Sequence, residues 1–95
     1  MAIKNFKCKD SEALFNGRRI ARWVSIERAA LRKLEQLSWS ALLDDLRAPP
    51  GNRLEALKGN RKGQHSIRIN DQWQVCFIWS NSDDCATNVE IVDYH

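Results

Sequence analysis

The chain has 95 residues, with 15 Lys or Arg, 12 Asp or Glu and a formal net charge of +3. This length is enough for one small domain with a two-layer core and too short for two independent cores, so we expect a single domain over residues 1–95. No run approaches the roughly 18 apolar residues of a membrane span, and the charged opening is unlike a signal peptide. These features exclude a membrane protein and favour a cytoplasmic one.

The cysteines Cys8, Cys76 and Cys85 are odd in number and widely spaced. Without a Cys-x-x-Cys pair they match neither a disulfide framework nor a zinc site. We therefore expect reduced, structural thiols and no bound metal.

Basic residues are unevenly distributed. Residues 1–33 carry nine Lys or Arg against three acids, residues 47–68 carry six against Glu55 alone, and none follows Arg68. This asymmetry is typical of a surface that faces a polyanion. For the arginines of the first third, a solvated helix face is an equally good explanation. The cluster over residues 53–68 also contains turn glycines, which favours contact with phosphate.

In chain order, residues 2–7 are compatible with a first strand. Asp10 or Ser11 can cap a short helix, which Gly17 ends. A basic linker over residues 17–22 follows.

The main packing helix is predicted to begin near Val24. Its apolar residues recur at intervals of three and four and therefore share one face. They are Trp23, Ile26, Ala30, Leu34 and Leu37. Another helix, with Leu42, Leu43 and Leu46 as its apolar positions, can start at residues 38–40, and the prolines at 49–50 end it.

Residues 57–79 predict a β-hairpin. A basic, glycine-flanked turn over residues 58–63 precedes one alternating run, and residues 70–72 reverse the chain into a second. Because successive side chains of a strand point to opposite faces, the runs divide into two sets. The core set is His65, Ile67, Ile69, Trp73, Val75, Phe77 and Trp79, and the opposite set is Ser66, Arg68, Gln74, Cys76 and Ile78. After a polar loop, residues 89–92 form a last strand.

Helices in the first half and strands in the second predict an α+β fold, in which the long helix covers one face of an antiparallel sheet. The open face would hold the basic turn, Arg68 and the C-terminal side chains. We expect a concave basic surface there.

The chain contains no nucleotide-binding glycine loop, nucleophile elbow or zinc-protease helix. The remaining groups suit RNA. Cleaving RNA without a metal needs a base for the ribose 2′-hydroxyl, a cation for the charge that develops on the phosphate, and an acid for the leaving 5′-oxygen. Cations are available at Lys58, Arg61 and Arg68, and proton-handling candidates at Glu55, His65, Asp93, Tyr94 and His95.

Several candidates also have a purely structural explanation. A terminal residue such as His95 is commonly an exposed chain end. His65 shares its strand face with two isoleucines and fits a packed histidine. Trp73, Phe77 and Trp79 recur with period two and fit a core better than a base-stacking platform. Pattern alone therefore predicts a small α+β domain that contacts nucleic acid.

Three segments carry a resemblance to a known family: PPGNRLEALKG at 49–59, GQHSIRINDQW at 63–73 and VEIVDYH at 89–95. They resemble the HigB toxins, the "plasmid maintenance system killer" family within the RelE/ParE superfamily. The opening residues 3–6 and the helical first half also fit. The resemblance implies the RelE-like fold, with an antiparallel-rich sheet and the N-terminal helices on one face, and neither metal nor organic cofactor.

The resemblance further implies a toxin of a type II toxin–antitoxin pair that cuts mRNA at the ribosomal A site. Its implied partners are the ribosome, mRNA and a HigA-like helix-turn-helix antitoxin, through which it reaches operator DNA. In the family, the lysine of the Leu-Lys-Gly motif and the terminal Asp-Tyr-His contribute to cleavage. These roles carry over to Lys58, Asp93, Tyr94 and His95. We add Arg68 and Glu55 as catalytic candidates, and as RNA-binding candidates Arg53, Arg61, Lys62, Arg18 and Arg19.

Two positions depart from the family pattern. Some relatives have a His at the position of Glu55, where a carboxylate can act as a base but not as a cation. The residue after the hairpin Trp is commonly Arg in the superfamily and is Gln74 here. Losing that Arg would cost on the order of 10²-fold in rate, unless Arg68 or Arg61 contacts the same phosphate. The alternatives are a weak or non-catalytic homologue that acts mainly in the antitoxin and operator complex, and a ParE-like gyrase inhibitor, which no specific residue supports.

Overall fold

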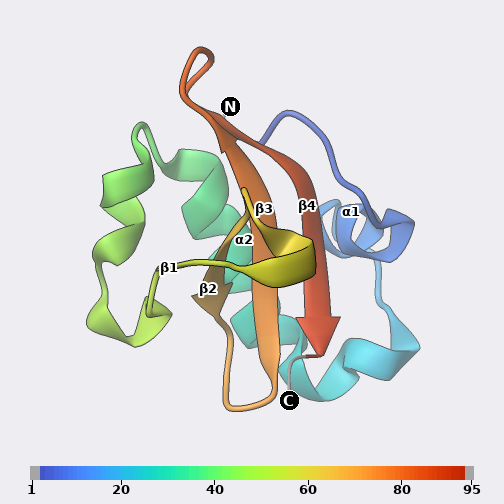
Figure 1. Ribbon diagram of the computed structural model, residues 1–95. Helices are drawn as coiled ribbons and strands as arrows, with labels where there is room; N and C mark the ends of the chain where they lie inside the picture. The colour runs from blue at the N-terminus through green and yellow to red at the C-terminus, as the bar shows by residue number, and fades with distance from the viewer. Residues whose placement is uncertain (1–2, 94–95) are drawn as a thin grey trace.

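The computed structural model describes residues 3–93, and its helices precede its strands (Figure 1). The helical half contains α1 (Lys9–Phe15), the 3₁₀-helix η1 (Ala21–Ile26), α2 (Glu27–Trp39) and the 3₁₀-helices η2 (Leu43–Arg47) and η3 (Pro50–Asn52). The second half contains β1 (Glu55–Ala56), the 3₁₀-helix η4 (Gly59–Arg61), β2 (His65–Arg68), β3 (Trp73–Ser80) and β4 (Cys85–Asp93). The predicted α+β class is confirmed.

The four strands form one sheet in the order β1-β2-β3-β4, and each neighbouring pair is antiparallel. Helices α1 and α2 lie on one side of it, α2 behind β2 and β3 and α1 beside β4 (Figure 1). The helix face predicted from the apolar spacing is the buried one, with Ala30, Leu34 and Leu37 fully enclosed. They pack with Ile67, Val75, Phe77 and Val89 of the sheet in one apolar core.

A register shift between β3 and β4 keeps β4 in this core. Cys76 pairs with Glu90 but Ile78 pairs with Thr87, so Phe77 lies opposite an extra residue in β4. Asn88 takes up the bulge with a φ of 53°, a conformation that Asn tolerates better than most residues. Ala86 and Val89 are consequently both buried although they are three positions apart.

Two predicted details of the N-terminal segment are wrong. The strand expected over residues 2–7 is absent from its described part, residues 3–7, where Ile3 and Phe6 make isolated parallel bridges to Ala86 and Val89. The residue that precedes α1 is Cys8. Ser11 instead lies inside α1, fully buried, where its Oγ accepts a hydrogen bond from the Ile91 backbone N–H at 3.0 Å.

The helix predicted to start at residues 38–40 is also wrong, because α2 continues to Trp39 and only the short η2 follows. The Asp45 carboxylate accepts hydrogen bonds from the backbone N–H groups of Ala41 and Leu42 at 3.0 and 2.9 Å, a capping contact that fixes the start of η2 at Leu43. Leu46 is buried, whereas the side chains of Trp39 and Leu42 are exposed.

The basic turn crosses the face of the sheet that is opposite to α2. In Figure 1 the segment from β1 through η4 runs in front of β3 towards β4. Cys76 and Leu57 are buried on this side, outside the main core. We call residues 57–63 the strap. The strap covers one end of the open face and leaves the other end accessible.

Within the described part of the chain, no helix has the length and apolar character needed to cross a membrane.

Candidate functional site

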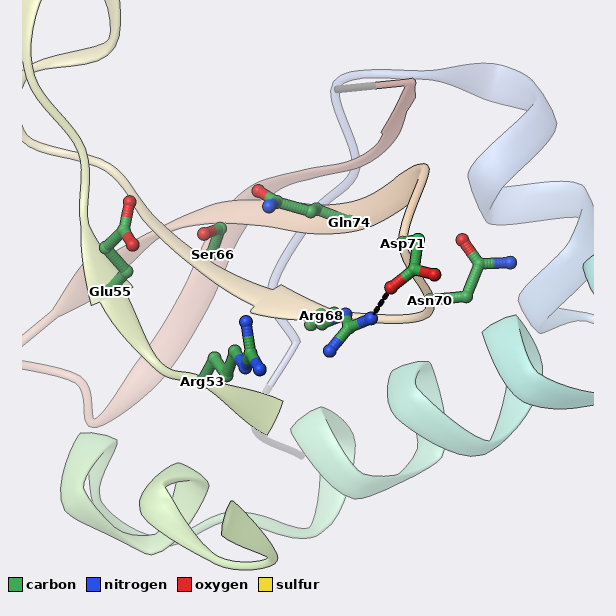
Figure 2. A pocket seen from close by; sticks show the side chains of 7 residues that line it. All are labelled: Arg53, Glu55, Ser66, Arg68, Asn70, Asp71 and Gln74. Atoms are coloured by element: carbon green, nitrogen blue, oxygen red, sulfur yellow. Dashed lines mark hydrogen bonds and ion pairs between the residues drawn. The ribbon is translucent and has the colours of Figure 1, made fainter. Parts of the chain in front are cut away.

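The uncovered end of the open face contains a pocket of about 270 Å³ (Figure 2). Strands β1, β2 and β3, the residues just before β1 and the β2–β3 turn all contribute side chains. The lining residues are Arg53, Glu55, Ser66, Arg68, Asn70, Asp71 and Gln74.

The sheet register explains why these side chains meet. Glu55 pairs with Ser66, and Arg68 pairs with Gln74. Ser66 and Arg68 are two residues apart in β2 and therefore point to the same face. This is the face that the alternation predicted for Ser66, Arg68 and Gln74.

Arg53 reaches the pocket through an anchored loop. Asn52, the preceding residue, is fully buried. Its Nδ2 donates to the backbone oxygens of Leu46 and Ala48, and its Oδ1 accepts from Lys33 Nζ of α2. The loop is thereby tied to the helix layer, and Arg53 follows with a φ of 46°. Burial and the neighbouring Arg32 lower the pKa of Lys33.

Carboxylates balance the arginines of the pocket. Arg68 forms an ion pair with Asp71, which lies three residues later in the β2–β3 turn (Figure 2). Glu55 is exposed at the pocket rim. The predicted concave surface is present, but it is mixed in charge and not simply basic.

Gln74 brings a neutral amide to the pocket. Its Oε1 is buried and has no hydrogen-bond partner within residues 3–93. A buried acceptor without a partner is costly.

The basic residues of the strap do not line this pocket. Lys58 lines a second hollow with Glu55, Ala56 and Leu57, and Lys62 is exposed. Arg61 is turned towards the protein: its Nη1 donates to Gln64 Oε1 at 3.2 Å, and its Nη2 lies 3.7 Å from Glu90 Oε1.

The last described residue, Asp93, is at the pocket end of the sheet. It pairs with Trp73, one step along β3 from Gln74, and its Oδ2 accepts a hydrogen bond from Gln72 Nε2 at 3.1 Å. The catalytic candidates Tyr94 and His95 lie outside the described residues.

The remaining candidates are elsewhere. His65 is stacked on Phe77 with ring centroids 6.2 Å apart, and burial lowers its pKa. Arg18 and Arg19 lie in the linker before η1 and line two further hollows. Arg19 is paired with Glu27 at 3.7 Å.

Sequence reasoning missed Asn52, Ser66, Asn70 and Asp71. Asn70 and Asp71 were seen only as turn residues and Ser66 only as an outward-facing one. Asn52 had a signal, since an Asn after Pro-Pro-Gly is typical of a shaped turn, but its burial depends on a helix far away in sequence.

A family model described as "RelE-like toxin of type II toxin-antitoxin system HigB" matches residues 4–95. The chain belongs to this HigB family. Toxin HigB-1 of Vibrio cholerae serotype O1 is 54% identical over 55 residues, which are 58% of each chain. An uncharacterized protein of Haemophilus influenzae is 36% identical over 59 residues, which are 62% of this chain and 58% of that one. Each alignment thus spans somewhat more than half of the curated relative.

Among solved structures, a YoeB/ParE toxin from Agrobacterium tumefaciens superposes over the full length of both chains with a TM-score of 0.55 and 19% identity. At this identity the likeness establishes the fold. The HigB assignment and the RelE-like fold expected from the sequence are therefore confirmed.

Proposed function

We propose that this HigB family member is an endoribonuclease that cuts mRNA on the ribosome without a bound metal ion. A HigA-like helix-turn-helix antitoxin would neutralise it and bring it to operator DNA, and the toxin would act in the cytoplasm, where ribosomes translate. The observation that carries the proposal is the pocket on the open face. It combines two arginines with two carboxylates, next to the strand end at Asp93, which Tyr94 and His95 follow in the sequence.

The proposed reaction is attack of the ribose 2′-oxygen on the adjacent phosphorus with breakage of the bond to the 5′-oxygen. Glu55 takes the proton of the 2′-hydroxyl. Arg68 and Arg53 hold the phosphate and stabilise the charge that develops on it. The segment after Asp93 supplies the proton for the leaving 5′-oxygen, which leaves a 2′,3′-cyclic phosphate and a 5′-hydroxyl.

The strap extends the RNA contact beyond the pocket. Lys58 shares a hollow with Glu55, so a strand of RNA whose reacting phosphate is at Arg68 can pass Lys58 and Lys62 with its neighbouring phosphates. We assign Arg61 the task of holding the strap on β4 through Glu90.

Cell-free translation followed by primer extension on the mRNA tests the proposal. The wild-type protein should create new 5′ ends that appear only when the message is translated. Arg68→Gln and Glu55→Gln should each lower the cleavage rate by on the order of 10²-fold. Arg47→Gln is the matched control, because Arg47 is an exposed arginine of η2 that pairs with Asp44 outside the pocket.

A second candidate function is favoured by Gln74 and by the carboxylates of the pocket. Such a site suits a weak catalyst, or a homologue whose main task is to hold the antitoxin on DNA. Intact mRNA in the translation assay, together with tight binding to the antitoxin, would support this reading and overturn the first.

A further inference from the structure

The pocket does not share the basic character of the surrounding sequence. The chain is positively charged overall, yet the pocket sets Glu55 and Asp71 against Arg53 and Arg68, so that the formal charges of its lining cancel. A site that grips phosphate gains most of its affinity from uncompensated cations. One of the two carboxylates is in direct contact with an arginine.

That carboxylate is Asp71, and the turn directs it back to Arg68. Asn70 Oδ1 accepts hydrogen bonds from the backbone N–H groups of Gln72 and Trp73 at 2.8 and 2.9 Å, which fixes the reversal. Asp71 therefore projects towards the β2 end from which the chain has just come (Figure 2). Its carboxylate meets the guanidinium of Arg68 where an RNA phosphate would be placed.

The two partners differ in exposure. The Arg68 side chain is 28% exposed, whereas that of Asp71 is 96% exposed. Asp71 can thus rotate into water at little cost, while Arg68 stays at the pocket wall. Exposed ion pairs contribute little to stability, so an RNA phosphodiester, which carries the same single negative charge as the carboxylate, can replace it.

We propose that Asp71 is a built-in competitor of the RNA phosphate at Arg68 and lowers the affinity of the toxin for RNA. The inference rests on the proposed function, because it concerns the same pocket and the same ligand. The other two charged residues of the pocket differ from this pair: neither Arg53 nor Glu55 forms an ion pair with another residue in the described range 3–93. Binding of RNA exchanges one anion for another at Arg68 and leaves Asp71 in solvent.

A double-mutant cycle on Arg68 and Asp71 tests the inference. The probe is a non-cleavable 2′-O-methyl RNA oligonucleotide, and binding is followed by fluorescence anisotropy at several salt concentrations. The proteins are the wild type, Asp71→Asn, Arg68→Gln and the double variant. Asp84→Asn is the matched control: it removes one exposed turn carboxylate at the other end of the sheet, where φ is 50° and Asn is tolerated.

Asp71→Asn should bind the probe about two- to fivefold more tightly than the wild type. Its affinity should also depend more steeply on salt, by roughly 0.7 in the slope of log K against log salt, because Arg68 then releases a counterion of the RNA. The double variant should bind no more tightly than Arg68→Gln, and Asp84→Asn should match the wild type.

Equal gains for Asp71→Asn and Asp84→Asn would overturn the inference, since the effect would then be one of net charge. The inference would also be overturned if Asp71→Asn increased the affinity for the probe even in the absence of Arg68, or if no variant bound the probe. The cleavage assay on translated mRNA judges the proposed function separately, so the two can fail independently.

Discussion

At the scale of single residues, the wall of the pocket at Gln74 lacks the positive charge that is typical of a phosphate-binding site. Gln74 is half-buried, lies directly across from Arg68 and keeps a buried oxygen without a partner. A neutral amide orients a ligand but supplies no charge to a phosphate. The position therefore supplies no positive charge to a phosphate, and a substitution that adds one tests its importance directly.

Gln74→Arg should raise the rate of mRNA cleavage, by up to about 10²-fold if the new guanidinium reaches the reacting phosphate. It should also cost about 0.2–1 kcal/mol of folding stability, because like charges face one another across a strand pair. Single-turnover cleavage and chemical denaturation measure the two effects. Asn81→Arg, which adds the same charge at the exposed β3–β4 turn, should leave both unchanged; equal stimulation by both variants would point to general attraction of RNA.

At the scale of elements, the strap decides how much of the sheet face is open. Its own Leu57 is buried, and its Arg61 is held by Gln64 and Glu90. Under it lies Cys76. Burial raises the pKa of that thiol to about 11, an effect that Arg61 opposes and Glu90 adds to.

Alkylation of Cys76 should therefore report opening of the strap. A thiol with a pKa near 11 has few thiolates at pH 8 and is buried as well, so it should react slowly in the native protein. Arg61→Ala removes the contacts to Gln64 and Glu90 and should speed labelling of Cys76 severalfold, as read by mass spectrometry of peptides. Cys85, buried at the start of β4 and away from the strap, is the reference; acceleration at both cysteines would indicate global loosening.

At the scale of the whole molecule, the spacing of apolar residues correctly predicted which faces of the helices and strands are buried. The buried face of α2 and the two faces of the hairpin followed from spacing alone, because burial repeats with the geometry of the element. The resemblance supplied the family. The start of a helix expected at residues 38–40 was wrong because α2 continues to Trp39, and the Asp45 side chain instead caps the later and shorter η2.

Other features required the assembled fold. The bulge at Asn88 and the buried hub at Asn52 depend on partners far away in sequence, on β3 and α2. The same holds for the strap, whose crossing of the sheet no local pattern encodes. Of the predicted site, the structure brings Arg53, Glu55 and Arg68 together and leaves Lys58 in the adjoining hollow.

The free energy of unfolding should depend on pH through His65, whose ring stacks on Phe77. Burial lowers its pKa in the folded state below the ordinary value of 6.5. The unfolded chain therefore binds this proton more readily than the folded one, and linkage requires stability to fall as pH drops from about 6.5 towards the folded pKa. Well above 6.5 the residue is neutral in both states and contributes no slope. Thermal unfolding between pH 7.5 and 5 measures the effect, and His65→Gln should flatten the curve in this window. An unchanged slope in that variant would assign the pH dependence to another group and show that His65 is not held neutral by its packing.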